Sequence, residues 1–207
     1  MRGKKIVLAT ICCIFLIGSS VAYASYGTEH VLKGNFDHKG DKTTINVYLD
    51  SSVGSYGYTT FVNNAKTGWD NASASLTLGT TSDSDCTGCI AVYVGSDFLA
   101  PGYIGWCDFW YKNFLGFWTE RSFSSVESGP NFTRARVRLD DDHLDAAGAN
   151  SITNTMNAGH ELGHALSLAH FNNAPAHSGD HWMKTGLLSL SAPTATDKDH
   201  LVNKWGP

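Results

Sequence analysis

Long hydrophobic runs are scarce in this sequence of 207 residues, and the only extended one lies near its beginning. Ile6–Ile17 is predominantly apolar, Met1–Lys5 carries three positive charges, and Ala22-Tyr23-Ala24 supplies small residues where a signal peptidase cuts. A membrane-spanning helix needs about 20 apolar residues, and this run is shorter. We therefore predict a secretory signal peptide over residues 1–24, with an uncleaved anchor as the alternative.

Basic residues are in the minority, at 15 Lys and Arg against 19 Asp and Glu, which gives a formal charge of −4. Loss of the predicted signal peptide removes three of these basic residues and makes the net charge more negative. This balance disfavours nucleic acid and anionic membrane surfaces as partners. No repeat or low-complexity linker divides the rest of the chain, so we expect one secreted, extracellular domain over residues 25–207. We expect it to act as a monomer, without stable membrane association once the signal is removed.

Cysteine is also scarce, with five in the chain, and Cys12 and Cys13 lie in the predicted signal. The mature chain would keep Cys86, Cys89 and Cys107. An oxidising destination favours one disulfide, which we predict between Cys107 and either Cys86 or Cys89. The Cys-x-x-Cys spacing could alternatively indicate a redox pair or half of a zinc knuckle, although no second close Cys or His pair lies nearby.

Hydrophobic periodicity predicts strands first and helices later. Alternating or apolar runs predict strands at Thr43–Leu49, Ile90–Val94 and Arg134–Leu139. Val53–Tyr58 is rich in glycine and is typical of a turn. Apolar residues at near-helical spacing predict an early helix over Thr60–Ala74.

The second half of the chain changes period. Residues 103–118 are unusually aromatic, which favours core strands, with an exposed groove for an apolar side chain as the alternative. A helical period begins at Ser151, and a last helix is predicted from about Thr196, with Gly206 as its stop signal. This order of elements predicts an α+β domain.

The stretch "HELGHALSLAH", residues 160–170, carries the strongest chemical signal. His160 and His164 lie one turn apart on one face of a helix, so both imidazoles can reach one metal ion. Glu161 lies beside the first of them, where its carboxylate can take a proton from metal-bound water. This spacing predicts a zinc site with a general base.

A third protein ligand must come from elsewhere. No glutamate follows Glu161, which excludes the zinc peptidases that take a glutamate from a later helix. Asp180, Asp197 and Asp199 are available, but His170 has the most compact spacing. On a continuous helix His170 would lie about 240° beyond the preceding histidine, so we expect the helix to end between them.

Residues 160–170 resemble the metzincin signature His-Glu-x-x-His-x-x-Gly-x-x-His, with Ser167 in place of the glycine. Glycine is favoured there because it adopts left-handed backbone geometry without a Cβ clash, and we expect serine to do so at a cost of about 1–2 kcal/mol. Met183, in "GDHWMKTG", looks like the methionine turn of these enzymes. The last stretch, residues 189–206, is similar to that of secreted bacterial matrixin-like peptidases.

The resemblance implies a twisted mixed β-sheet with an early helix, an active-site helix and a C-terminal helix. It implies Zn²⁺ held by His160, His164 and His170, and an extended peptide bound along an edge strand near Tyr103–Cys107. Thr185 occupies the position of a tyrosine that helps to stabilise the oxyanion in some metzincins. That task would therefore fall mainly to zinc, as in the matrixin-like branch.

Two further features point to metals more weakly. Asp140–Asp142 with Asp145 could bind Ca²⁺, but the run lacks a glycine-turn loop and is more typical of a solvated strand end. His177 and His181 could add or replace a zinc ligand, but are more typical of solvated loop histidines.

Together these patterns predict a secreted zinc-dependent endopeptidase that acts on peptide or protein substrates. Glu161 would be the general base, and water on the zinc would attack the peptide carbonyl. The alternative is a secreted binding module whose zinc is structural, completed by a fourth ligand from His177, Asp180 or His181. Hydrolysis of something other than a peptide is a third possibility.

Overall fold

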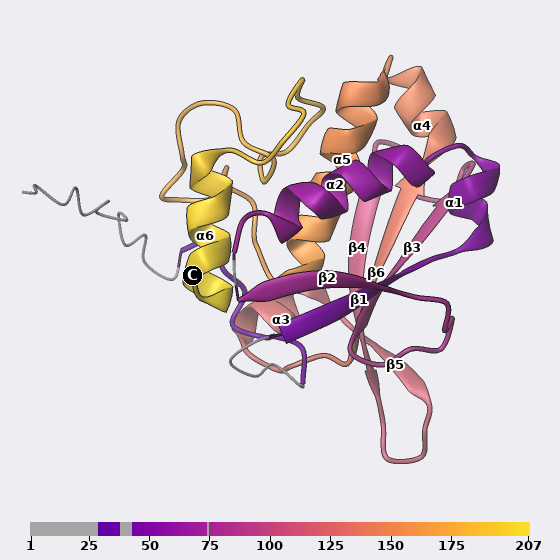
Figure 1. Cartoon of the computed structure of the whole chain (residues 1–207), viewed down its shortest axis with the longest axis vertical. Coiled ribbons are helices and arrows are strands. Elements are labelled where there is room, and N and C mark those ends of the chain that lie inside the picture. Colours follow the sequence, from indigo (N-terminus) through magenta and orange to yellow (C-terminus); the bar gives the residue numbers. More distant parts are fainter. Residues whose placement is uncertain (1–28, 38–42, 74) are drawn as a thin grey trace, which may run out of the picture.

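A computed structural model describes residues 29–37, 43–73 and 75–207, so the predicted signal peptide lies outside the described residues (Figure 1). The strands are β1 (Thr43–Leu49), β2 (Leu76–Thr81), β3 (Cys89–Gly95), β4 (Gly105–Lys112), β5 (Trp118–Arg121) and β6 (Arg134–Asp140). The helices are α1 (Ser51–Ser55), α2 (Thr59–Asp70), α3 (Phe123–Ser128), α4 (Asp141–Ala146), α5 (Ser151–Ala165) and α6 (Ala195–Trp205). The α+β prediction is confirmed.

The strands form one mixed sheet in the order β2-β1-β3-β6-β4-β5. Strands β2, β1, β3 and β6 pair in parallel, and β4 pairs antiparallel with both of its neighbours, β6 and β5. The pairing of β5 covers only Phe109–Lys112 of β4, so Gly105–Asp108 pairs with β6 alone. This half of β4 is therefore a free sheet edge.

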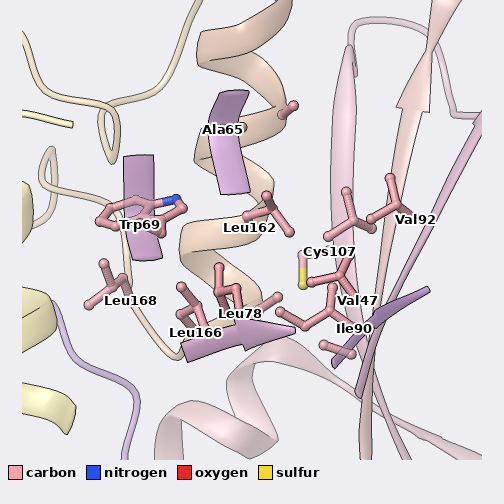
Figure 2. Close-up of a cluster of buried hydrophobic side chains, with 14 of the residues drawn as sticks. Val47, Ala65, Trp69, Leu78, Ile90, Val92, Cys107, Leu162, Leu166 and Leu168 are labelled. Atoms are coloured by element: carbon pink, nitrogen blue, oxygen red, sulfur yellow. The ribbon is translucent and has the colours of Figure 1, made fainter. Parts of the chain in front are cut away.

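Helices α2 and α5 pack against each other over one face of the sheet (Figure 1). Their apolar sides meet the inward side chains of the strands, as Figure 2 shows for Ala65 and Trp69 of α2, Leu162 of α5, and Val47 and Ile90 of the sheet. Burial of these side chains supplies the main stabilisation of the domain. The position of α5 is thereby fixed against β4 and β6.

Two local predictions need correction. Val53–Tyr58 was expected to be a turn, but helix α1 begins at Ser51 because Asp50 caps it by accepting a hydrogen bond from the Ser52 amide at 2.9 Å. The early helix ends at Asp70, before the predicted Ala74. The sequence did not predict strand β2, because its segment is rich in glycine and threonine and shows only a weak alternation of apolar and polar residues.

The predicted disulfide to Cys107 is wrong. Cys86 and Cys89 bridge each other, with their Cα atoms 6.0 Å apart, and Cys107 is a buried free thiol on β4. Strand β6 lies between β3 and β4, which separates Cys89 from Cys107 by about 10 Å across the sheet. A disulfide requires Cα atoms closer than about 7 Å.

Candidate metal centre

Helix α5 positions the first two histidines and the glutamate. Its first turn is closed by a capping box, in which the Asn150 side chain accepts from the Thr153 amide and the Thr153 hydroxyl accepts from the Asn150 amide. The helix then continues without a break to Ala165. His160 and His164 consequently project from the same face, and both are buried.

The helix ends as the sequence predicts, at a residue in left-handed geometry. Ser167 has φ of 68°, and the Leu168 amide donates to the Gly163 carbonyl at 3.0 Å, closing the last turn. The chain reverses here. The segment before β1 holds the reversal, because the Leu32 amide donates to the Ser167 carbonyl at 2.8 Å and Val31 forms a bridge with Leu168.

This reversal brings the third histidine to the other two. The Nε2 atoms of His160 and His164 lie 3.1 Å apart. The Nε2 atom of His170 lies 3.1 Å from that of His160 and 3.0 Å from that of His164. Among the described residues, these three form the only group of His, Cys, Asp or Glu side chains that could hold a metal ion. The predicted ligands are therefore brought together.

The hydrogen bonds behind the imidazoles determine which nitrogens face the shared point. Nδ1 of His160 donates to the Trp182 carbonyl at 2.6 Å, and Nδ1 of His164 donates to the Leu168 carbonyl at 2.8 Å. A carbonyl only accepts, so in a neutral imidazole both Nε2 atoms carry lone pairs. Two lone pairs at 3.1 Å cannot bond each other. A cation bound between them satisfies both, so the residues present fit a metal.

Burial keeps these imidazoles neutral. It lowers the pKa of His160 to about 4, with a further contribution from the neighbouring His170. It also holds the pKa of His164 well below 6.5 and lowers that of His170. Metal ligation needs the unprotonated form, which is therefore available at neutral pH.

Glu161 lies against the free edge of β4. A Cβ atom on Gly105 would come within 2.6 Å of its Oε1, so the glycine makes room for the carboxylate. Burial raises the pKa of Glu161 to about 8, opposed by the positive charge of Arg138. A cavity of about 450 Å³ opens beside Glu161. Its walls include the three histidines, Trp106 of β4 and Phe123 of α3.

Met183 packs against α5 at the turn of the helix that precedes His164. A Cβ atom on Gly163 would clash with its Sδ, so this turn of α5 rests directly on the methionine. The turn is held by Asp197 of α6, whose carboxylate accepts from the amides of Trp182 at 3.0 Å and Met183 at 3.1 Å. Asp197 is thus structural and not a metal ligand.

The other proposed metal residues do not join the site. His181 bonds the Thr194 hydroxyl and the Ser178 carbonyl, each at 2.8 Å, and Nε2 of His177 lies 2.8 Å from that of His200. Asp180 is exposed and is not part of the metal-binding group.

The calcium hypothesis gains no support among the described residues. Asp140 is fully buried and accepts from the amides of Phe98 at 2.6 Å, Leu99 at 2.8 Å and His143 at 3.1 Å. Its carboxylate therefore joins the end of β6 to α4 and to the loop after β3. Asp141 and Asp142 lie in the first turn of α4, where their negative charges interact favourably with the positive end of the helix dipole.

Sequence reasoning missed the roles of three residues that shape the centre. The Trp182 carbonyl orients His160, Phe123 packs edge-on against His164 at 5.3 Å between ring centroids, and Asp197 fixes the methionine turn. Only Asp197 had a readable signal, since Thr194-x-x-Asp197 is a capping box. The others depend on chain segments distant in sequence.

Comparison with known proteins gives a distant likeness in structure alone. No family model and no curated protein matches the sequence. Two solved structures of myroilysin are similar to this chain, at 15% identity, TM-score 0.41 and coverage of 80% of this chain and 93% of the other, and at 14% identity, TM-score 0.43 and coverage of 90% and 96%.

Proposed function

We propose that this protein is a secreted zinc-dependent endopeptidase of the metzincin type. The observation that carries the proposal is the convergence of three neutral imidazole Nε2 atoms, 3.0–3.1 Å apart, beside the buried carboxyl of Glu161. The site opens into a cavity large enough for a substrate segment.

His160, His164 and His170 would hold the metal, and the nitrogen-only set of three histidines suits zinc. When bound, zinc would act as a Lewis acid toward water and the peptide carbonyl, and its charge would favour the ionised form of the neighbouring carboxyl. The carbonyls of Trp182 and Leu168 hold two of the rings in position and keep their Nε2 atoms unprotonated.

Glu161 would move the protons of the reaction. Its carboxylate would accept a proton from the attacking water and deliver it to the leaving amine. Burial favours this exchange, because it already raises the pKa of the carboxyl to about 8 in the absence of a metal. Gly105 leaves the carboxyl room against the sheet edge.

The free edge of β4 supports a peptide substrate. Residues 105–108 have unpaired backbone groups on the side away from β6, and residues 102–107 line the cavity. An extended peptide could add to this edge as a strand, with main-chain hydrogen bonds supplying affinity. Trp106 and Phe123 would then receive an apolar side chain.

The competing function, a binding module with structural zinc, needs a fourth protein ligand. The described part of the chain offers three, and His177 and His181 bond other groups. A three-ligand site with an adjacent cavity favours catalysis.

Zinc content and cleavage of a mixed peptide library by the secreted protein test the proposal. We expect about one zinc per chain, endoproteolysis that a chelator abolishes, and loss of both with His170→Ala. The matched control is His177→Ala, which lies outside the group of three histidines and should keep zinc and activity. Stoichiometric zinc without cleavage of any peptide would favour the binding module, and absence of zinc would refute both.

A further inference from the structure

The β4–β5 hairpin ends in an exposed apolar tip. Phe114 is 95% exposed, Leu115 64% and Phe117 65%, and the hairpin projects beyond the sheet (Figure 1). The tip is a built turn, because the side-chain oxygen of Asn113 accepts from the amides of Leu115 and Phe117, each at 3.0 Å. Three large apolar side chains are therefore held in solvent, an arrangement that marks an interaction site.

A small cavity lies behind the tip, on the sheet face opposite α5. It measures about 150 Å³ and is lined by Tyr93, Trp110, Trp118, Arg134 and Arg136. Its walls are thus aromatic rings and two guanidinium groups.

One of these guanidinium groups, that of Arg134, forms no ion pair with a carboxylate of the described residues, although the charge of Asp85 acts on it from further away. Arg134 is only 9% exposed, donates to the Tyr93 hydroxyl at 2.9 Å and leaves its Nε without a hydrogen-bond partner. Within the described ranges no carboxylate lies within ion-pair distance of it, whereas Arg136 and Arg138 both pair with Asp108. A buried charge is normally paired, so this cavity is suited to an oxyanion from outside the chain.

The order of these groups along the hairpin matches the layers of a lipid surface. Lys112 and Trp118 form the last pair before the tip, and Trp110 lies two residues further back, about 7 Å at the rise of a strand. Interfacial segments bury their apolar side chains about 5–10 Å below the headgroups. With the tip at that depth, Trp118 and Lys112 would lie among the headgroups, where tryptophan is favoured.

We propose that this hairpin docks the protein reversibly on a phospholipid surface, with the tip among the acyl chains and a lipid phosphate in the Arg134 cavity. Three side chains are too small a patch for a stable protein interface, which buries about 800 Å² per partner. The negative net charge of the chain is not concentrated at the tip. Lys112 pairs with Asp85 at 2.8 Å, Glu120 and Arg121 are neighbours of opposite charge on β5, and Arg134 has no ion pair among the described residues.

Vesicle sedimentation tests this proposal without any requirement for proteolysis. The secreted protein, with its N-terminus determined by mass spectrometry, is mixed with phosphatidylcholine vesicles with and without phosphatidylglycerol. We expect binding to fall about tenfold or more when Phe114, Leu115 and Phe117 are all replaced by Ser. Arg134→Gln, on β6, should also weaken binding. Arg121→Gln removes a charge from the hairpin itself but outside the cavity, and should not weaken binding.

The unmodified protein provides a second measurement. Lipids brominated on their acyl chains should quench its tryptophan fluorescence, because Trp118 and Trp110 would lie near the interface. No binding by the unmodified protein, or equal binding by the tip variant and the unmodified protein, would overturn the proposal. Cleavage of a short soluble peptide should be unchanged in the tip variant, which separates docking from catalysis.

Discussion

The backbone carbonyl of Trp182 accepts a hydrogen bond from Nδ1 of His160 at 2.6 Å. The same residue's amide donates to Asp197 at the start of α6. The C-terminal helix is therefore connected through one turn to an imidazole of the candidate metal centre on α5. Substitutions in this turn should change the metal centre without touching the metal.

The contact between α5 and the methionine turn gives a first prediction. Gly163→Ala places a Cβ against Met183 Sδ and near the Trp69 ring, so we expect a loss of about 1–3 kcal/mol in the free energy of unfolding and weaker metal binding. Urea unfolding and metal titration measure both. Gly54→Ala is the control, because its nearest neighbour lies at 3.9 Å. Equal stability of the two variants would contradict this packing.

Glu161→Gln should reduce kcat/KM by at least about 10²-fold, because the amide cannot accept and return the proton. Zinc content should be unchanged, since the side chain keeps its size and is not a ligand. Peptide hydrolysis and metal analysis on the same sample test this expectation. The control variant Glu120→Gln, on β5, should retain full activity. Full activity of the Glu161→Gln variant would exclude Glu161 as the general base.

The serine in the reversal after α5 should cost stability. Ser167 has φ of 68° and a buried hydroxyl without a hydrogen-bond partner, so Ser167→Gly removes both penalties. We expect a gain of about 1 kcal/mol or more in the free energy of unfolding. Ser167→Ala removes only the hydroxyl and should gain less. A larger gain from alanine than from glycine would show that the backbone is unstrained.

Stability of the metal-free protein should depend on pH in two opposite ways. The pKa of His160 is lowered to about 4, so the unfolded chain binds more protons between pH 4 and 6.5 and stability rises with pH there. His164, His170 and His200 act in the same direction. The pKa of Glu161 is raised from 4.5 to about 8, so the folded chain keeps a proton that the unfolded chain loses, and this group lowers stability as pH rises from about 4.5 towards 8.

The expected result is maximum stability near pH 6.5, measured by urea unfolding in the presence of a chelator. The decline from pH 6.5 to 8 should be on the order of 2 kcal/mol. Glu161→Gln should abolish that decline and steepen the rise below pH 6.5, because the raised pKa of Glu161 opposes the histidines from about pH 4.5 upward. A decline of the same size in Glu161→Gln would assign it to another group.

Cys107 should not react with a thiol reagent in the native protein. It is buried, and burial raises the pKa of its thiol well above the usual value, so little thiolate forms. Thiol titration should detect no rapidly reacting thiol in buffer and one in denaturant. Peptide mapping should find Cys86 linked to Cys89. A native thiol that reacts rapidly would contradict this assignment.

The sequence by itself was sufficient for the local part of the metal centre. The spacing of His160 and His164 puts them on one helical face, because an α-helix has 3.6 residues per turn. The position of His170 required the helix to end, and the structure confirms the end and the left-handed residue at Ser167. Strands β1, β3 and β6 were also readable, since each shows a regular period.

Only the tertiary structure decided what depends on distant segments. The sequence led us to expect a disulfide to Cys107, but strand order separates Cys89 from Cys107, and Cys89 bridges Cys86 instead. The hydrogen bond from His160 to the Trp182 carbonyl and the one from the Leu32 amide to the Ser167 carbonyl join residues far apart in the chain. Sequence periodicity records how one segment folds on itself, whereas strand order and packing decide which segments become neighbours.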